Sequence, residues 1–270
     1  GQGVVDHFAY DVTDGIAAVG SSLDITVTGI NDAPVVAGDA GLVAEDGLLL
    51  ATGNVLANDT DVDAGTVLQV ASPGAYVGAY GTLSLQADGS YSYSLANDSL
   101  AVQSLAGGSF AVDSFAYAAT DGLVSVDSAL DITVLGTNDA PVTANDAAIV
   151  VEDWLTAASG NVLANDTDVD QGTVLQVANP GTYAGEFGSL SLGGDGRYVY
   201  TLDNAAAKIQ SLGRDAAVVE HFGYTATDGQ VGTNAMLDVY LHGTNDAPTV
   251  FSPLADHDVT FNKPFSWQVP

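Results

Sequence analysis

The stretch that decides the fold class is residues 81–95, which read GTLSLQADGSYSYSL. On each side of Asp88-Gly89, apolar residues alternate with polar ones, from 82 to 87 and from 90 to 95. Alternation with a period of two is typical of a β-strand that buries one face. An Asp-Gly pair between two such runs indicates a two-residue turn, because both residue types tolerate a positive φ. This segment therefore predicts a β-hairpin.

The same pattern returns around Asp195-Gly196, and other motifs recur with it at a constant spacing. The tetrapeptide NDAP occurs at 31–34, 138–141 and 245–248, and both steps are 107 residues (138 − 31 and 245 − 138). The octapeptide LANDTDVD keeps this step, at 56–63 and 163–170. A repeat of this length is the size of a domain rather than of a solenoid unit. The sequence predicts two whole modules, 35–141 and 142–248, with the C-terminal part of a preceding repeat at 1–34 and the start of a further domain at 249–270.

Other alternating runs predict additional strands in each module. Phe115, Tyr117 and Ala119 share one face of such a run, and equivalent runs precede each NDAP motif. One short helix per module is expected at 97–105 and at 204–212, with Asn97 and Asn204 as N-caps. Many short strands joined by Gly and Asp turns are typical of a β-sandwich. We therefore expect an all-β fold of tandem β-sandwich modules in a linear array.

The charge of the chain restricts its partners. It has 34 Asp and Glu against 4 Lys and Arg, for a formal net charge of −30. Such a chain is a poor ligand for nucleic acid or for an anionic membrane, and a good one for cations. Its 47% hydrophobic content argues against an acidic disordered chain. No apolar run reaches the roughly 18 residues of a membrane span, and the absence of Cys excludes disulfides and thiolate metal sites.

Each octapeptide concentrates aspartates at alternate positions. The candidate ligands are Asp59, Asp61 and Asp63, and one repeat later Asp166, Asp168 and Asp170. Three carboxylates this close repel one another unless a cation neutralises them, and Ca²⁺ prefers six to eight oxygen ligands in irregular geometry. The EF-hand pattern is absent, because Gly65 falls at the seventh position and Val70 occupies the twelfth. The alternative is a solvated acidic turn between two strands.

A second group of polar residues surrounds each NDAP motif. The candidates are Asn138, Asp139, Glu152, Asp153 and Asp121 in the second copy; Asn31, Asp32, Glu45, Asp46 and Asp14 in the first; and Asn245, Asp246 and Asp228 in the third. We expect a cation here to join residues of neighbouring modules and to fix the angle between them. The alternative is a polar, proline-containing linker that moves freely. Asp88-Gly89 and Asp195-Gly196 are interpreted as hairpin turns only.

The sequence gives little support for catalysis. His7 and His221 occupy equivalent positions, but Ser114 fills the same position in the middle copy. A catalytic residue would recur in each module, so we expect the histidines to be structural. No nucleophile elbow, zinc-binding helix or phosphate-binding loop is present. The chain is predicted not to be an enzyme.

Several of these segments resemble a known family. Residues 81–93 and the run from Asp113 to Asp139 are similar to the signature of VCBS repeats. Residues 54–63 resemble bacterial cadherin-like tandem repeats, so the β-sandwich modules would be Ig-like or cadherin-like. Residues 249–270 look like the opening of a dystroglycan-type cadherin-like domain. The resemblance covers residues 1–248.

The resemblance implies a secreted, extracellular role at a bacterial cell surface. Its members are large RTX-type adhesins, in which such repeats act as extenders in cell adhesion or biofilm formation. Distal domains of such proteins bind host or matrix glycans. Relatives bind calcium at module junctions, where Asn138 and Asp139 would match the linker motif and Glu152 would come from the following module. The linker has a single Asn-Asp pair, so one ion per junction is expected.

Two other functions remain open at this point. The first is an adhesive module that binds glycans or proteins, with Tyr76, Tyr80, Tyr183 and Phe187 as a platform in a Gly-rich segment. The second is an acidic halophilic surface that needs no specific metal. Recurrence of Asp at fixed loop positions favours specific calcium binding over a general solvation surface.

Overall fold

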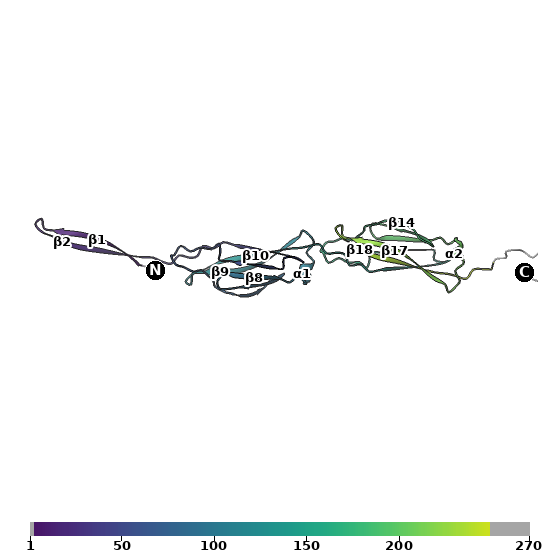
Figure 1. Cartoon of the computed structure of the whole chain (residues 1–270), viewed down its shortest axis with the longest axis horizontal. Helices are drawn as coiled ribbons and strands as arrows, with labels where there is room; N and C mark the ends of the chain where they lie inside the picture. The colour runs from purple at the N-terminus through teal and green to yellow at the C-terminus, as the bar shows by residue number, and fades with distance from the viewer. Residues whose placement is uncertain (1–2, 249–270) are drawn as a thin grey trace, which may run out of the picture. The chain divides into compact units, whose positions relative to one another are not determined.

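The computed structural model describes residues 3–248, so the expected further domain at 249–270 lies outside the described residues. The described chain is built almost entirely of β-strands, with two α-helices of four residues each. The expectation of an all-β fold is therefore confirmed (Figure 1).

The first complete repeat forms two four-stranded sheets, in the orders β3-β10-β9-β5 and β4-β8-β7-β6. Its elements are β3 (Asp39–Ala44), β4 (Leu50–Asn54), β5 (Gln69–Val70), β6 (Gly74–Val77), β7 (Gly81–Leu85), β8 (Ser90–Leu95), α1 (Leu100–Gln103), β9 (Phe110–Thr120) and β10 (Ser125–Leu135). The hairpin predicted from residues 81–95 is confirmed, because β7 pairs antiparallel with β8. The expected two-residue turn is wrong: Gln86 N donates to Ser90 O across the turn, and of the Asp-Gly pair only Gly89 has a positive φ, at 83°.

The core of this repeat lies between the two sheets. Alternate residues of each strand point inward, so the period-two pattern of the sequence becomes one buried face per sheet. Tyr93 of β8 packs against Phe115 of β9 with ring centroids 5.9 Å apart. Leu83, Ile132 and Val134 are fully buried in the same cluster. Burial of these side chains joins the two sheets into one sandwich.

The second repeat has the same topology, with sheets β11-β18-β17-β13 and β12-β16-β15-β14. Its elements are β11 (Asp146–Val151), β12 (Ala157–Asn161), β13 (Gln176–Val177), β14 (Gly181–Ala184), β15 (Gly188–Leu192), β16 (Arg197–Leu202), α2 (Ala207–Gln210), β17 (Ala217–Thr227) and β18 (Gly232–His242). Tyr200 and Phe222 repeat the aromatic contact of the first core, at 5.8 Å.

The compact units of the structure differ from the sequence repeats. One unit contains the described residues up to Thr143 together with Asp166–Gln176 and Ala226–Thr233. The other contains Ala144–Asn165, Val177–Thr225 and the described residues from Asn234 onward. The loops that carry Asp168, Asp170 and Asp228 therefore belong to the first unit, with the NDAP motif at 138–141.

One strand pair in each repeat is parallel. Strand β3 runs parallel to β10, with Ala44 opposite Leu135, and β11 runs parallel to β18, with Val151 opposite His242. Parallel strands end at the same edge of a sheet. The residues that follow β3 therefore lie beside those that follow β10, although they are some ninety positions apart in the sequence.

Both helices occur where the sequence predicts them, but they begin later, and the expected caps are wrong. Ser99 is the N-cap of α1 and accepts a hydrogen bond from Val102 N, while Ala206 occupies this position before α2. Asn97 instead exchanges two hydrogen bonds with Asp46, at 2.9 and 2.7 Å. Asn204 does the same with Asp153, at 3.0 and 2.7 Å. Tertiary contact with a neighbouring turn has replaced the local capping interaction.

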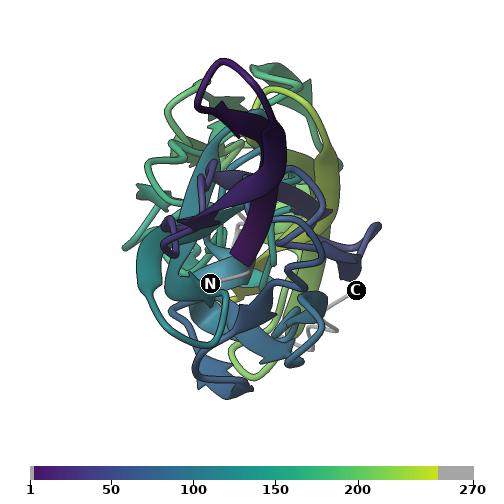
Figure 2. The ribbon, with the colours of Figure 1, turned by 90° about the vertical axis from the view of Figure 1, so that its left-hand side faces the viewer.

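Residues before the first NDAP motif form a separate hairpin of β1 (Gly3–Thr13) and β2 (Ala18–Thr28). The two strands pair along their whole length, and no other described strand joins this sheet. Figures 1 and 2 draw it in purple. Every residue of both strands is exposed.

Candidate metal centre

Glu45 and Asp46 follow strand β3 and begin the site. Glu45 is 1% exposed, and its Oε2 accepts a hydrogen bond of 2.9 Å from Thr137 N, beyond the end of β10. Its other oxygen, Oε1, is buried and has no hydrogen-bond donor. Asp46 has φ 52°, a left-handed conformation uncommon outside glycine, and the hydrogen bonds of Asn97 hold it there. The parallel pairing of β3 and β10 thus brings Glu45 to the NDAP motif.

Asn138 and Asp139 continue the site from the linker. Asn138 Nδ2 donates to Asp228 Oδ2 at 2.7 Å, and Gln230 Nε2 donates to Asn138 Oδ1 at 2.6 Å. The backbone N–H of Asp139 donates to Asp170 Oδ2 at 3.0 Å. Asp139 Oδ2 is buried without a donor. The linker is therefore held by side chains of two separate loops.

Asp168 and Asp170 complete the site. Their loop is anchored by a two-residue β-bridge, in which the backbones of Val142 and Thr167 exchange hydrogen bonds of 2.8 and 3.0 Å. Asp170 N donates to Asp168 Oδ1 at 2.9 Å, which orders the turn. Asp168 Oδ2 and Asp170 Oδ1 are buried and lack a donor. We call Glu45, Asp46, Asp139, Asp168 and Asp170 the carboxylate cluster.

The electrostatics of the carboxylate cluster are unfavourable without a counter-charge. Burial raises the pKa of Glu45, and the carboxylates of Asp139, Asp46 and Asp170 add to the rise. Burial also raises the pKa of Asp139, followed by repulsion from Asp170, Asp46 and Asp168. The pKa of Asp170 is raised by burial and then by Asp168. Among the described residues, no Lys, Arg or His forms an ion pair with any member.

The donor set of the cluster fits a calcium ion. Four of its carboxylate oxygens, from Glu45, Asp139, Asp168 and Asp170, are buried and have no hydrogen-bond donor. Buried carboxylates normally accept hydrogen bonds or bind a cation, because desolvation of the charge is otherwise uncompensated. Calcium accepts many carboxylate oxygens in irregular geometry, whereas magnesium demands a regular octahedron and retains water. These four side chains would hold the ion.

The structure groups the predicted ligands differently from the sequence. Glu152 and Asp153, expected beside Asn138 and Asp139, lie beside Asp246 instead, and the carboxylate oxygens of the three are within 4.8 Å of one another. Glu152 Oε2 accepts from Thr244 N at 2.9 Å, as Glu45 does from Thr137. The grouping was wrong because it assumed that Glu152 meets the motif preceding it in the chain. Parallel pairing of β11 with β18 takes it to the motif that follows.

The two groups that the sequence treats as separate also meet. In the copy around Asn31, Asn31 Nδ2 donates to Asp121 Oδ2 at 2.7 Å and Asp32 N donates to Asp63 Oδ2 at 2.9 Å. This matches the contacts of Asn138 with Asp228 and of Asp139 with Asp170. The sequence analysis expected Asp121 beside Asn138, Asp228 beside Asn245, and Glu45 beside Asn31. All three expectations are wrong: Asp121 contacts Asn31, Asp228 contacts Asn138, and Glu45 contacts Thr137 next to Asn138. In each copy the octapeptide aspartates approach the motif that precedes them.

The remaining candidates have local roles. Asp59 Oδ1 accepts from Ala37 N at 2.9 Å, and Asp59 and Asp61 line one hollow, each with a buried oxygen that lacks a donor. Asp166, the counterpart of Asp59, is buried. Asp14 accepts from Ile16 N and Ala17 N within its own turn. Asn245 Nδ2 donates to Asp246 O at 3.1 Å.

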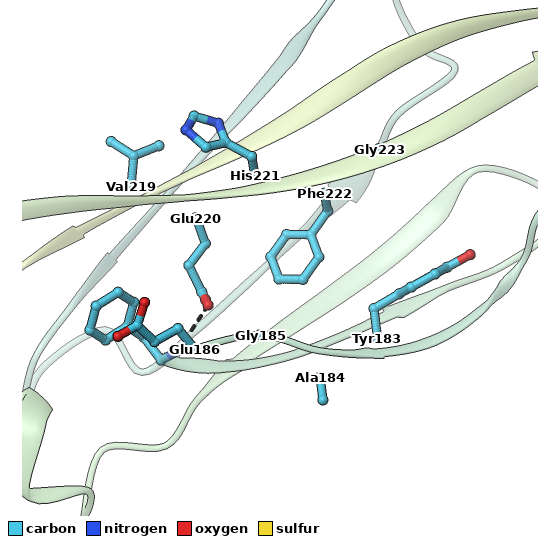
Figure 3. Close-up of a pocket in the computed structure, with 10 residues that line it drawn as sticks. Tyr183, Ala184, Gly185, Glu186, Val219, Glu220, His221, Phe222 and Gly223 are labelled. Atoms are coloured by element: carbon cyan, nitrogen blue, oxygen red, sulfur yellow. Dashed lines mark hydrogen bonds between the residues drawn. The ribbon is translucent and has the colours of Figure 1, made fainter.

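Two buried carboxylates were missed by the sequence analysis. Asp113 in β9 accepts hydrogen bonds from Ala79 N (2.7 Å), Tyr80 N (3.0 Å) and Tyr93 Oη (2.7 Å). Glu220, its counterpart in β17, accepts from Phe187 N and Tyr200 Oη. Figure 3 shows Glu220 and Phe222 directed toward the loop that carries Gly185, with His221 on the opposite side of the strand. The sequence does carry a signal for such a residue: in β9 an acidic residue falls at a position that the alternation of the strand assigns to the core.

The histidines and the expected aromatic platform contact their own chain. His7 and His221 each pair with an aspartate on the neighbouring strand, Asp24 and Asp238, as Ser114 does with Asp131 in the middle copy. Tyr76 and Tyr183 donate to the backbone carbonyls of Ser72 and Asn179. Lys208 Nζ lies 5.0 Å from the ring centre of Phe187, and Tyr80 packs against the first core. These contacts orient the rings within their own modules.

Neither described helix has the length or the apolar character that a membrane span requires. A family model for the bacterial cadherin-like domain matches residues 31–136 and 138–244. No curated protein matches the chain.

Among solved structures, protocadherin gamma C5 EC1-3 is 16% identical with a TM-score of 0.50, and the match covers 88% of this chain and 77% of that one. The cadherin domains 1–5 of protocadherin gamma B2 are 15% identical with a TM-score of 0.55, covering 91% and 46%. An endo-fucoidan hydrolase of glycoside hydrolase family 107 reaches a TM-score of only 0.28, at 15% identity, covering 88% and 34%. The two protocadherin matches indicate a shared fold and nothing further, and the hydrolase match carries no argument.

Proposed function

The chain belongs to the bacterial cadherin-like domain family, and from this premise we propose that its repeats are calcium-stabilised structural extenders of a large secreted adhesin. Extenders hold an adhesive domain away from the cell surface, in cell adhesion or biofilm formation. VCBS-type and RTX-type membership, location at a bacterial surface and the start of a dystroglycan-type domain at 249–270 are parts of the same proposal. The ligand of the adhesin would then bind elsewhere in the parent protein.

One observation carries this proposal: the four buried oxygens without donors in the carboxylate cluster. These carboxylates repel one another and have no cationic partner among the described residues, so they need another source of positive charge. Calcium supplies it, and it is the hard cation that suits an all-oxygen, carboxylate-rich donor set. The cluster therefore supports calcium as the resident ion.

The origin of the ligands in the sequence explains the structural role. Glu45 comes from the first repeat, Asp139 from the linker, and Asp168 and Asp170 from the second repeat. An ion bound by all four would oppose bending at the linker, because bending would break coordination bonds. A polypeptide linker without such an ion retains hinge motion. Calcium would thus convert a flexible tandem into a stiff spacer.

The test combines binding with flexibility. Calorimetric titration of the chelated chain should show saturable calcium binding, and small-angle scattering should show a longer, less flexible tandem in calcium than in chelator. Magnesium at the same concentration serves as the control and should have a smaller effect. If calcium neither binds nor changes the scattering curve, the extender proposal fails.

A further inference from the structure

Strand β17 has no partner strand along most of one edge. It has 11 residues, whereas its neighbour on this side, β13, has two. The first repeat shows the same mismatch, because β5 pairs only with Thr120 and Ala119, at the end of the 11-residue strand β9. An unpaired edge of this kind can bind another strand through its free N–H and C=O groups.

A proline explains why the pairing with β17 stops. Ala178 N donates to Thr225 O at 2.9 Å, one residue beyond β13. The next donor in an antiparallel ladder would be residue 180, which is a proline and has no N–H. The side chain of Asn179 makes the last contacts, with Thr225 N at 2.9 Å and Gly223 O at 3.5 Å. After Pro180 the chain crosses to the other sheet as β14.

The alternation of the strand identifies which backbone groups are free. Thr225 directs its N–H and C=O toward this edge. Every second residue of a strand repeats that direction, so Gly223, His221 and Val219 do the same. No strand in the described part of the chain pairs with this edge beyond β13. We call residues 219–223 the open edge of β17.

A hollow of about 430 Å³ lies along the open edge. Its walls are residues 219–223 of β17 and residues 183–187, which contain the end of β14 and the loop that follows it. Figure 3 shows Glu220 and Phe222 directed into the space between these two segments. Strand β14 is itself the last strand of its sheet. The hollow therefore lies where both sheets of the second repeat end.

The charge of the hollow favours a cationic occupant. Glu220 is 8% exposed and Glu186 is exposed, and among residues 3–248 neither forms an ion pair with Lys, Arg or His. Lys208 Nζ lies over the ring of Phe187, 5.0 Å from its centre, and pairs with neither carboxylate. The formal net charge of −30 attracts cations and repels a second copy of the chain. The first repeat has Ala79 in place of Glu186, so its edge lacks this carboxylate.

We propose that the open edge of β17 binds an extended, basic polypeptide segment of a partner, which adds a strand to this sheet. Backbone hydrogen bonds with Val219 and His221 would hold the segment, and a Lys or Arg side chain would pair with Glu186. Side chains alternate along a strand, so every second one would enter the hollow. A glycan has no regular ladder of N–H and C=O groups, so the unpaired edge fits a polypeptide.

Titration of the full chain with a synthetic peptide tests this proposal. The probe is a short capped peptide in which Lys and Val alternate, used in calcium and at physiological salt to screen general attraction. Fluorescence anisotropy should show saturable binding, and hydrogen exchange should show new protection of residues 217–223. The same peptide with every backbone N–H methylated keeps its charge but cannot form a ladder, so it should not bind. Failure of the first peptide to bind, or equal binding of the methylated one, overturns the proposal.

Matched variants of the chain locate the site. Glu186→Gln should weaken the peptide by about threefold, as expected for one exposed ion pair, whereas Asp98→Asn, at an exposed position of the first repeat, should not. Val219→Pro removes one edge N–H and should weaken binding more than about tenfold, whereas Val112→Pro, its counterpart in β9, should not.

Thermal unfolding checks that both proline variants fold, and the methylated peptide tests strand pairing on the unaltered chain. Equal losses of affinity in Glu186→Gln and Asp98→Asn would show attraction to the overall charge and overturn the proposal. Protection of other strands without residues 217–223 would also overturn it.

Discussion

Glu45 combines burial, an oxygen without a hydrogen-bond donor and three neighbouring carboxylates. Its backbone position follows from the end of β3, but its partners come from distant parts of the sequence. The proposed role in calcium binding therefore leads to two tests on single residues. Both depend on the fact that a buried charge without a partner destabilises a protein until an ion neutralises it.

Replacing Glu45 by Gln should separate metal binding from folding. We expect calcium affinity at this site to fall by at least about tenfold, because one anionic ligand is lost. The chelated variant should be as stable as the chelated parent or slightly more stable, because a neutral amide relieves the repulsion. Calorimetric titration and thermal unfolding measure the two effects. Glu186→Gln, which changes an exposed glutamate, is the control, and an equal loss of affinity there would contradict the assignment.

The pH dependence of stability should have opposite signs with and without calcium. Burial and nearby carboxylates raise the pKa of Glu45, Asp139 and Asp170, so the folded state binds more protons than the unfolded one. Stability without calcium then falls as pH rises from the ordinary pKa of about 4 through the raised pKa values. Acidification from pH 7 toward roughly 5 should therefore raise the Tm in chelator. In saturating calcium it should lower the Tm, because protons compete with the ion.

Two features of the same titration serve as checks. Hydrogen bonds from Val124, Asn31 and Leu123 lower the pKa of Asp121, so its contribution to stability is lost only as pH falls below about 4. General repulsion among 34 acidic residues also weakens on acidification. In chelator, Glu45→Gln should accordingly reduce the change of Tm with pH without abolishing it. If the Tm changed with pH in the same direction with and without calcium, the result would argue against a metal at the carboxylate cluster.

At the scale of elements, the close approach of a loop to strand β9 fixes the two sheets together. Asp113 accepts two backbone N–H groups of the loop between β6 and β7 and the hydroxyl of Tyr93 in β8. Burial and these contacts with Asp113 raise the pKa of Tyr93. The tyrosine therefore remains a hydrogen-bond donor to Asp113 at neutral pH.

Gly78→Ala should destabilise the first repeat by about 2–3 kcal/mol. The new Cβ would lie 2.2 Å from Asp113 Oδ2, so the loop must retreat and its hydrogen bonds weaken. Gly74→Ala adds the same methyl group where nothing lies within 4 Å, and it should change stability by less than about 0.5 kcal/mol. Chemical denaturation of the two variants measures the difference. Equal stability of both would show that the loop does not depend on this contact.

At the scale of the whole molecule, the formal net charge of −30 distinguishes specific calcium binding from general screening. Calcium at a hundredfold excess over its Kd should stabilise the folded chain by about 2.7 kcal/mol for each site. Thermal unfolding at low salt, with millimolar calcium or with molar NaCl, measures the contrast. We expect calcium to give the higher Tm, because buried oxygens are poorly screened by salt. If molar NaCl alone raised the Tm as far as calcium does, the result would favour the halophilic alternative.

The sequence by itself determined the repeat of 107 residues, the strands and the face that each strand buries. These are local properties, because alternation fixes which side chains lie on the same side of a strand, as at residues 81–95. It also identified the acidic residues that make up the carboxylate cluster. Only the tertiary structure decided which of them meet. Parallel pairing of β3 with β10 brings Glu45 to Thr137, and the bridge between Val142 and Thr167 brings Asp168 and Asp170 to Asp139. Such pairing depends on the relative direction of strands far apart in the chain, on which local periodicity carries no information.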